Sequence, residues 1–128
     1  VKLQQLLSES DFGSLHCPLS DETRHLIGPA ELEVMKSSAF LINTSRGDVV
    51  EENALIEALR EGSIAGAALD VLSTEPPPKD HPLLGMDQVL VTPHVAWYSE
   101  QAAEEVVVGA FKHLARLLPQ FTPGAPRK

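Results

Sequence analysis

The chain has 128 residues, of which 43% are hydrophobic, and a formal net charge of -8 at pH 7. This length and apolar content suit one globular domain with a substantial core. The negative charge argues against binding to nucleic acid or to an anionic membrane, because phosphate groups would repel the chain at long range. Its apolar runs are shorter than the ~18 residues of a membrane span, and its single cysteine cannot form an internal disulfide, so we expect a cytoplasmic protein.

Four short apolar runs along the chain predict parallel strands. They lie at residues 12–16, 39–43, 65–71 and 89–92. Each run is nearly continuously apolar, which is typical of parallel strands that are covered on both faces.

Amphipathic segments between these runs predict helices. Pro29 suits the first turn of a short helix through residues 31–35, because the N–H that proline lacks would have no partner there. A second helix has its apolar stripe at residues 55–59, and Gly62 fits the left-handed position that ends a helix.

The last predicted element is a long helix that Ser99 would cap. Its apolar residues recur at helical spacing and define one face: Ala103, Val106, Val107, Ala110, Phe111, Leu114, Leu117 and Leu118. We interpret this face as core or subunit contact. Residues 119–128 contain three prolines and a glycine and are expected to form a tail.

The alternation of strands and helices implies right-handed βαβ units and an α/β fold with a doubly wound parallel sheet. A dinucleotide-binding domain of the Rossmann type opens with strand, G-x-G-x-x-G and helix, and none of the eight glycines forms this fingerprint. We therefore expect residues 1–118 to be the second half of such a domain, without its glycine-rich half. The strand at residues 12–16 would then be an open edge that invites pairing with another chain.

Polar side chains follow the predicted strands at the points where the strands end. Arg46 follows the second run, Asp70 lies near the end of the third with Glu75 shortly after it, and His94 follows the fourth. Side chains just beyond the carboxyl ends of neighbouring parallel strands converge on one crevice. A fixed cation, two carboxylates and an imidazole suit proton and hydride chemistry on a small carbonyl acid. Taken singly, each residue has a plainer interpretation as a surface charge, a turn former or a loop histidine.

A series of motifs covers nearly all of the chain. They read SDF at residues 10–12, SLHCPL at 14–19, TRHLI at 23–27, FLINTSRG at 40–47, GAALDV at 66–71 and TPH at 92–94. In this order the chain resembles the D-isomer-specific 2-hydroxyacid dehydrogenases, the family of phosphoglycerate dehydrogenase, glyoxylate reductase, formate dehydrogenase and the C-terminal binding proteins. Residues 94–102 are most similar to the branch of the C-terminal binding proteins and their bacterial relatives.

The resemblance implies catalytic roles for three residues. His94 would be the general acid that protonates a carbonyl oxygen, and Glu75 would pair with it and favour the imidazolium. Arg46 would clamp the carboxylate of the substrate or polarise its carbonyl, because guanidinium keeps its charge and offers two parallel donors.

The resemblance also implies NAD as the cofactor, with NADP as the alternative. Asp70 would bond the nicotinamide carboxamide, and Trp97 would form part of the wall over the substrate together with Arg46. The other positions that match the family's cofactor-lining residues are His16, Cys17, Pro18, Thr44, Ser45, Arg46 and His94. No two histidines have the helical spacing of metal ligands, so no metal site is expected.

Two functions remain open. The first is a segment of an oxidoreductase that interconverts 2-keto acids and D-2-hydroxy acids; the second is a non-catalytic module in which NAD-linked dimerisation matters more than turnover. The expected partners are the small acid and either a second copy of the chain or the missing N-terminal half. We expect the chain by itself to be a poor dehydrogenase. Asp48 is expected to weaken anion binding at Arg46, and Cys17 is expected to be a small buried residue.

Overall fold

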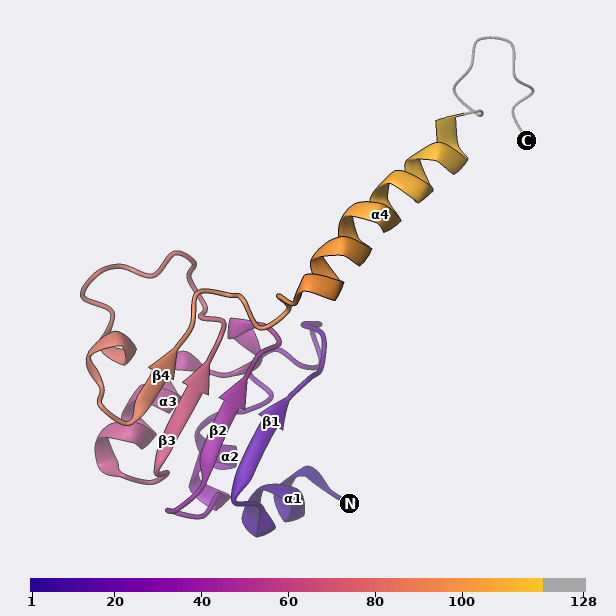
Figure 1. Ribbon diagram of the computed structural model, residues 1–128. Coiled ribbons are helices and arrows are strands. Elements are labelled where there is room, and N and C mark those ends of the chain that lie inside the picture. Colours follow the sequence, from indigo (N-terminus) through magenta and orange to yellow (C-terminus); the bar gives the residue numbers. More distant parts are fainter. Residues whose placement is uncertain (119–128) are drawn as a thin grey trace. The chain divides into compact units, whose positions relative to one another are not determined.

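The computed structural model describes residues 1–118 (Figure 1), so the tail expected at residues 119–128 lies outside the described residues. The chain divides into two compact units, Val1–Ala96 and the part that begins at Trp97. The first unit contains the whole sheet, and the second contains the last helix. The assignment of residues 1–118 to one half-domain stays a prediction.

The first unit is built on a four-stranded parallel sheet, which confirms the predicted α/β fold. Its strands are β1 (Phe12–Leu15), β2 (Phe40–Asn43), β3 (Gly66–Leu69) and β4 (Val89–Val91), in the order β1-β2-β3-β4. In the register of the sheet, Phe40 pairs with Phe12 on one side and with Gly66 on the other. All four predicted strands are present but shorter than expected, and β1 is an outer strand of the described sheet.

Three helices of the first unit lie on the same face of the sheet (Figure 1). They are α1 (Leu3–Glu9), α2 (Pro29–Val34) and α3 (Glu52–Glu61), and two short 3-10 helices, η1 (Gly47–Val49) and η2 (Pro82–Gly85), lie in the loops. Pro29 occupies the first turn of α2, as predicted. Gly62 ends α3 with a φ of 70°, in the left-handed region where a glycine has no Cβ to clash.

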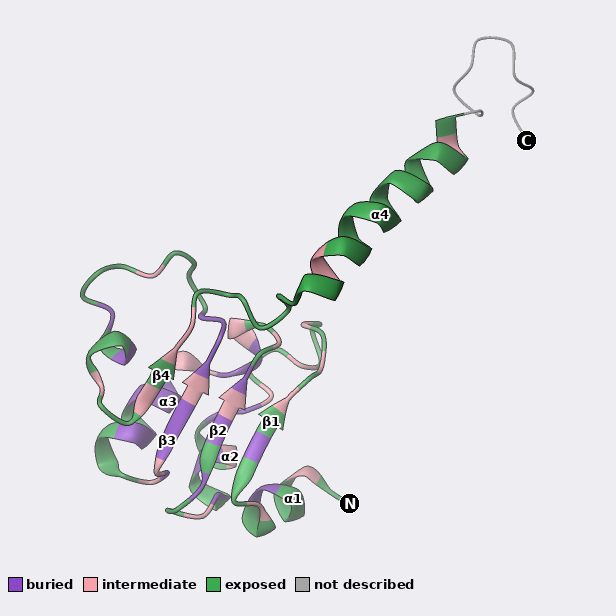
Figure 2. Cartoon of the chain, viewed as in Figure 1, coloured by how far each residue is buried: buried purple, intermediate pink, exposed green. Residues whose placement is uncertain are grey.

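The core lies between the sheet and these helices (Figure 2). Strand residues that face the helices are buried, as are the apolar stripes of the helices themselves. The largest buried apolar side chains are Ile27, Leu32, Leu41, Leu55, Leu59, Ile64 and Leu83. Removal of this surface from water is the main force that holds the strands in register, because a shift by one residue would turn each buried side chain outward.

The other face of the sheet corrects one prediction. Phe12, Phe40 and Leu90 are 67%, 40% and 64% exposed, and the rings of Phe12 and Phe40 stack with centroids 5.7 Å apart. Strands covered on both faces were predicted, but all three helices of the first unit cover the same side. The strands are therefore continuously apolar in sequence, although the sheet face that contains Phe12, Phe40 and Leu90 is exposed within the described residues.

The second unit contains α4 (Glu100–Leu117), whose first turn is capped as predicted. Ser99 Oγ accepts a hydrogen bond from Ala102 N at 3.0 Å. The helix has no buried residue, and Phe111 and Val106 are among its most exposed side chains, so the interpretation of its apolar face as core or subunit contact stays a prediction. Within residues 1–118, no helix combines the length and apolar character needed to cross a membrane.

Candidate active site

The turn that follows β2 is built around a buried polar side chain, Asn43. Its Oδ1 accepts hydrogen bonds from Ser45 N at 3.0 Å and from Ser45 Oγ at 2.8 Å, and its Nδ2 donates to the Arg46 carbonyl at 2.9 Å. An asparagine that bonds the backbone just ahead of it fixes a tight turn. Asn43 is not among the site residues predicted from the sequence, although an asparagine at the end of an apolar strand is the signal for such a turn.

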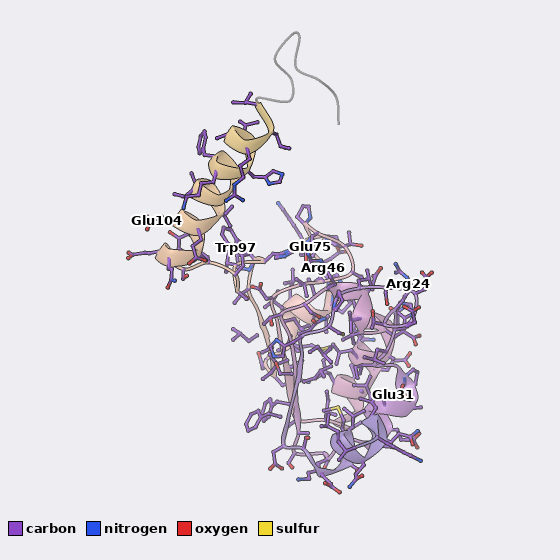
Figure 3. All side chains as sticks on the ribbon, turned by 90° about the vertical axis from the view of Figure 1, so that its right-hand side faces the viewer. Arg24, Glu31, Arg46, Glu75, Trp97 and Glu104 are labelled. Carbon is purple, nitrogen blue, oxygen red and sulfur yellow. The ribbon has the colours of Figure 1, made fainter. Side chains whose placement is uncertain are left out.

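Gly47 brings this turn against the loop that follows β3. A Cβ atom at Gly47 would lie 2.1 Å from the carbonyl carbon and oxygen of Leu72, so a side chain there would force the two loops apart. The loops after β2 and β3 are therefore in backbone contact. Figure 3 shows Arg46 and Glu75, one from each loop, at the same end of the first unit.

Asp70 anchors the turn that follows β4. It is 5% exposed, and its carboxylate accepts hydrogen bonds from Thr92 Oγ1 at 2.5 Å, Val95 N at 2.9 Å and Ala96 N at 2.8 Å. Burial raises the pKa of Asp70, but these three hydrogen bonds outweigh burial and hold the pKa below its ordinary value. A charged carboxylate at neutral pH therefore fastens the turn to the end of β3.

His94 lies inside this turn in an unusual backbone conformation. Its φ is 55°, in the left-handed region that residues with a Cβ seldom adopt. The backbone is held there because His94 N donates to the carbonyls of Asp70 and Thr92, both at 3.0 Å. Strained residues that the surrounding structure holds in place are concentrated at functional sites.

The imidazole of His94 pairs with Glu75, which comes from the loop after β3. Nδ1 of His94 and Oε2 of Glu75 are 2.7 Å apart, and Oε1 of Glu75 accepts a hydrogen bond from Leu72 N at 3.0 Å. The hydrogen bond from His94 is the main reason that the pKa of Glu75 is lowered; burial opposes it, and the Leu72 N–H adds to it. Both side chains are partly exposed. The two residues thus form an accessible acid–base pair with its carboxylate charged at neutral pH.

Two pockets lie beside these groups, at the carboxyl ends of the strands. The β3–β4 pocket has a volume of about 450 Å³ and is lined by Asp70, Glu75, Thr92 and His94 and by apolar side chains that include Leu72, Leu84 and Val91. The β1–β2 pocket has a volume of about 520 Å³ and is lined by His16, Cys17, Pro18, Leu19, Thr44, Ser45 and Arg46. The structure therefore gathers the residues from His16 to Ser45 that the resemblance implied for the cofactor into one pocket.

Arg46 lies with that second group. Its Nη1 donates to the Ser45 carbonyl at 2.7 Å, and its side chain lines the β1–β2 pocket, whereas Asp70, Glu75 and His94 line the β3–β4 pocket. The four groups expected at one cleft are thus distributed over two neighbouring pockets. Direct hydrogen bonds connect only the three residues of the β3–β4 side, among the contacts that the structure describes.

The structure also shows the surroundings of three further residues for which the sequence provides an expectation. Asp48 pairs with Arg24, and its expected weakening of an anion site at Arg46 stays a prediction. Cys17 is half-buried, because β1 ends at Leu15 and the cysteine lies in the turn beyond it. Trp97 belongs to the second unit, where its ring meets that of Tyr98 edge to face, and its place in a substrate wall stays a prediction.

No cluster of three or more His, Cys, Asp or Glu side chains within residues 1–118 is arranged to hold a metal ion. The arrangement at the β3–β4 pocket instead suits proton transfer. It combines an imidazole, a charged carboxylate that orients the ring through Nδ1, and an apolar wall beside them.

Comparisons with known proteins identify the family of the chain. The family model for the "D-isomer specific 2-hydroxyacid dehydrogenase, NAD binding domain" matches residues 1–96. A glyoxylate reductase of Korarchaeum cryptofilum is 54% identical over 101 residues, which are 79% of this chain and 30% of that protein. The chain spans about a third of the length of the curated relatives it matches.

Solved structures show the same fold. A D-lactate dehydrogenase from Sporolactobacillus sp. superposes with a TM-score of 0.88 at 36% identity and covers 97% of this chain and 41% of its own. The NAD complexed form of a D-isomer specific 2-hydroxyacid dehydrogenase from Lactobacillus delbrueckii ssp. bulgaricus gives a TM-score of 0.84 at 34% identity over 99% of this chain and 43% of its own. The chain therefore belongs to the D-isomer specific 2-hydroxyacid dehydrogenase family, and residues 1–96 match the NAD binding domain of that family.

Proposed function

We propose that this chain is the part of an NAD-dependent dehydrogenase that holds its acid–base pair, and that the whole protein interconverts 2-keto acids and D-2-hydroxy acids. The observation that carries the proposal is the 2.7 Å contact between His94 Nδ1 and Glu75 Oε2 at the mouth of the β3–β4 pocket. Relatives named glyoxylate reductase and D-lactate dehydrogenase support the same class of reaction.

The residues of the two pockets fit a nicotinamide dinucleotide. Thr44 offers a hydroxyl donor and Arg46 offers guanidinium donors beside the small apolar surfaces of Cys17 and Pro18, and Ser45 Oγ, which donates its proton to Asn43, offers an acceptor. Such a combination suits a ribose and a carboxamide or phosphate more than a purely apolar ligand. When bound, the nicotinamide supplies or accepts the hydride.

Asp70 can accept a hydrogen bond from this cofactor in addition to those that it accepts within the chain. Its two oxygens already accept three hydrogen bonds from the turn after β4, and a carboxylate has about four lone-pair sites, so one further donor can be accommodated. The carboxamide N–H₂ of a nicotinamide is a suitable donor. Asp70 would then fix both the turn that carries His94 and the orientation of the cofactor ring.

His94 would act as general acid in reduction and as general base in oxidation. Glu75 occupies Nδ1, so the exchanged proton passes through Nε2, and the carboxylate stabilises the imidazolium that forms when the ring takes a proton. Arg46 would bind the carboxylate of the substrate, because a guanidinium keeps its charge and matches a planar anion with two donors.

The cellular setting and assembly belong to the same proposal. We place the protein in the cytoplasm, where a lone half-buried cysteine stays reduced. The outer strand β1 and the exposed rings of Phe12 and Phe40 support association with a second copy or with another part of the same enzyme.

The proposal is tested by NADH-dependent reduction of glyoxylate, hydroxypyruvate and pyruvate by the full-length protein that carries this chain. We expect His94→Ala to lower kcat roughly 100- to 10,000-fold, the range for loss of a general acid. His113→Ala, which alters an exposed histidine of α4, is the matched control and should keep the wild-type rate. Equal background rates in all three proteins would favour the non-catalytic module instead.

A further inference from the structure

The loop that carries Glu75 has few contacts of its own. Residues 73–80 are exposed apart from the half-buried Pro77, whereas Leu72 on one side and His81 on the other are buried. Yet Glu75 must hold its carboxylate within hydrogen-bond distance of His94. An exposed loop between two buried ends keeps such a position only if the ends themselves are fixed.

One carboxylate fixes both ends. Glu52, the first residue of α3, accepts a hydrogen bond from Ser73 N at 3.0 Å through Oε2, and through Oε1 it meets Ser73 Oγ at 2.8 Å and His81 Nε2 at 3.0 Å. Ser73 is the first residue of the exposed stretch, and His81 is the first buried residue after it. The side chain of Glu52 therefore joins the two ends of the loop. We call the contacts of Glu52 with Ser73 and His81 the Glu52 clasp.

The hydrogen-bond roles of the two ring nitrogens of His81 follow from its second neighbour, Leu83. Its Nδ1 accepts a hydrogen bond from Leu83 N at 3.3 Å, so the ring proton lies on Nε2 and is donated to Glu52. His81 is 8% exposed, and both of its ring nitrogens are bonded. Burial raises the pKa of Glu52, but the hydrogen bonds from Ser73 and His81 outweigh burial and lower the pKa. The Glu52 carboxylate is therefore ionised at neutral pH.

A short series of contacts links this clasp to the acid–base pair. Ser73 is bonded to Glu52; the neighbouring Leu72 N–H holds Oε1 of Glu75; and Oε2 of the same carboxylate meets His94. In this series only Glu75 and His94 belong to the acid–base pair.

We propose that Glu52 is a positioning residue: through Ser73 and His81 it holds the loop after β3 so that Glu75 stays paired with His94. The proposal rests on the proposed function only for its consequence in catalysis. Its structural part concerns the geometry of Glu75 and holds whichever reaction the protein performs.

The experiment compares Glu52→Ala, Glu52→Gln and Ser73→Ala with the wild type. In the 128-residue chain, carbon-13 NMR follows the titration of the Glu75 carboxyl. We expect its pKa to rise toward the ordinary value most strongly in Glu52→Ala, because the loop loses both attachments. The rise should be smaller in Glu52→Gln, whose amide oxygen can still accept from Ser73, and smallest in Ser73→Ala, which loses one bond.

Two control variants separate positioning from general loosening. Ile56→Val creates a small core defect on the same helix, and Glu57→Gln removes a charge from that helix at an exposed position. Ile56→Val should lower Tm by a few degrees without moving the pKa of Glu75. Glu57→Gln should change neither. An unchanged Glu75 titration in Glu52→Ala, or an equal rise in Ile56→Val, would overturn the proposal; if Glu52→Ala does not fold, Ser73→Ala and Glu52→Gln decide.

Turnover by the full-length protein gives the second measurement. We expect Glu52→Ala to lower kcat roughly 10- to 100-fold with little change in the KM for NADH, because a misplaced pair weakens the transition state and not cofactor binding. If the wild type itself shows no turnover, the proposed function fails while the Glu75 titration still decides the clasp. If the titration shifts but a measurable kcat does not, the effect of Glu52 on catalysis is refuted, whereas its effect on the geometry of Glu75 is supported.

Discussion

The two pockets at the carboxyl edge of the sheet differ in how firmly hydrogen bonds within the chain hold their polar side chains. On the β3–β4 side, Asp70, Glu75 and His94 are held by hydrogen bonds from within the chain, and His94 is kept in a strained backbone conformation. On the β1–β2 side, the turn is fixed by Asn43, but Arg46 is exposed, and the one described hydrogen bond of its side chain goes to the carbonyl of the neighbouring Ser45. Under the proposed function, the groups that would move protons are thus held by the chain itself, whereas the side chain that would bind the carboxylate of the substrate has few contacts of its own among the described residues.

The largest effect is expected from removal of the Asp70 carboxylate. Asp70→Ala leaves Thr92 Oγ1 and the amides of Val95 and Ala96 without their acceptor, which should lower the free energy of unfolding by roughly 3 kcal/mol. Urea denaturation of the 128-residue chain measures this loss. Asp87→Ala, at an exposed position, is the matched control and should stay within ~0.5 kcal/mol of the wild type. Equal stability of the two variants would mean that the β3–β4 side is not held by Asp70.

The same carboxylate should make stability depend on pH. Because the pKa of Asp70 in the folded chain lies below its ordinary value of 3.8, its contribution is fully present above that value and is lost as pH falls through the lowered pKa. Glu75, with its own lowered pKa, acts in the same direction. Asp70→Asn should therefore be less sensitive to acid between pH 5 and 2 than the wild type, as urea midpoints at each pH would show.

A smaller effect, confined to binding, is expected on the β1–β2 side. Arg46→Ala should change the free energy of unfolding by less than ~0.5 kcal/mol, since the side chain is exposed. In the full-length protein it should raise the KM for the keto acid by roughly 10- to 100-fold, the loss of a charge-assisted bond. Arg46→Lys should recover only part of this loss, because an ammonium lacks the two parallel donors. Full recovery in Arg46→Lys would show that the charge alone matters.

The sequence predicted correctly those features that depend only on residues close together in the chain. The strands, the first turn of α2 at Pro29 and the Ser99 cap each depend on a few neighbouring residues, and all three are present. The exposed face of the sheet was not predictable in this way. An apolar run such as the one that contains Phe40 shows that a strand is suited to burial, but not whether a helix covers its second face.

Contacts between residues distant in sequence are the part of the site that the sequence did not indicate. The pairing of Asp48 with Arg24 and the clasp at Glu52 join side chains more than 20 positions apart, and neither leaves a periodic signal in the sequence. His94 and Glu75 are 19 positions apart, but here the motifs of the family supplied the expectation. Strand order explains why residues after β3 and β4 meet; it does not fix which pocket Arg46 lines.

The smallest predicted effect tests the strain at His94 directly. Replacement of an alanine by glycine normally destabilises a folded chain, but at a φ of 55° glycine relieves a clash between Cβ and backbone. His94→Gly should therefore be more stable than His94→Ala by about 1 kcal/mol. His25, with a φ of 54°, offers an internal control away from the two pockets and should show the same order. If alanine were the more stable residue at position 94 but not at 25, the turn would relax once the imidazole is gone. The strain on the β3–β4 side would then be maintained by the His94–Glu75 bond and not by the Asp70 anchor.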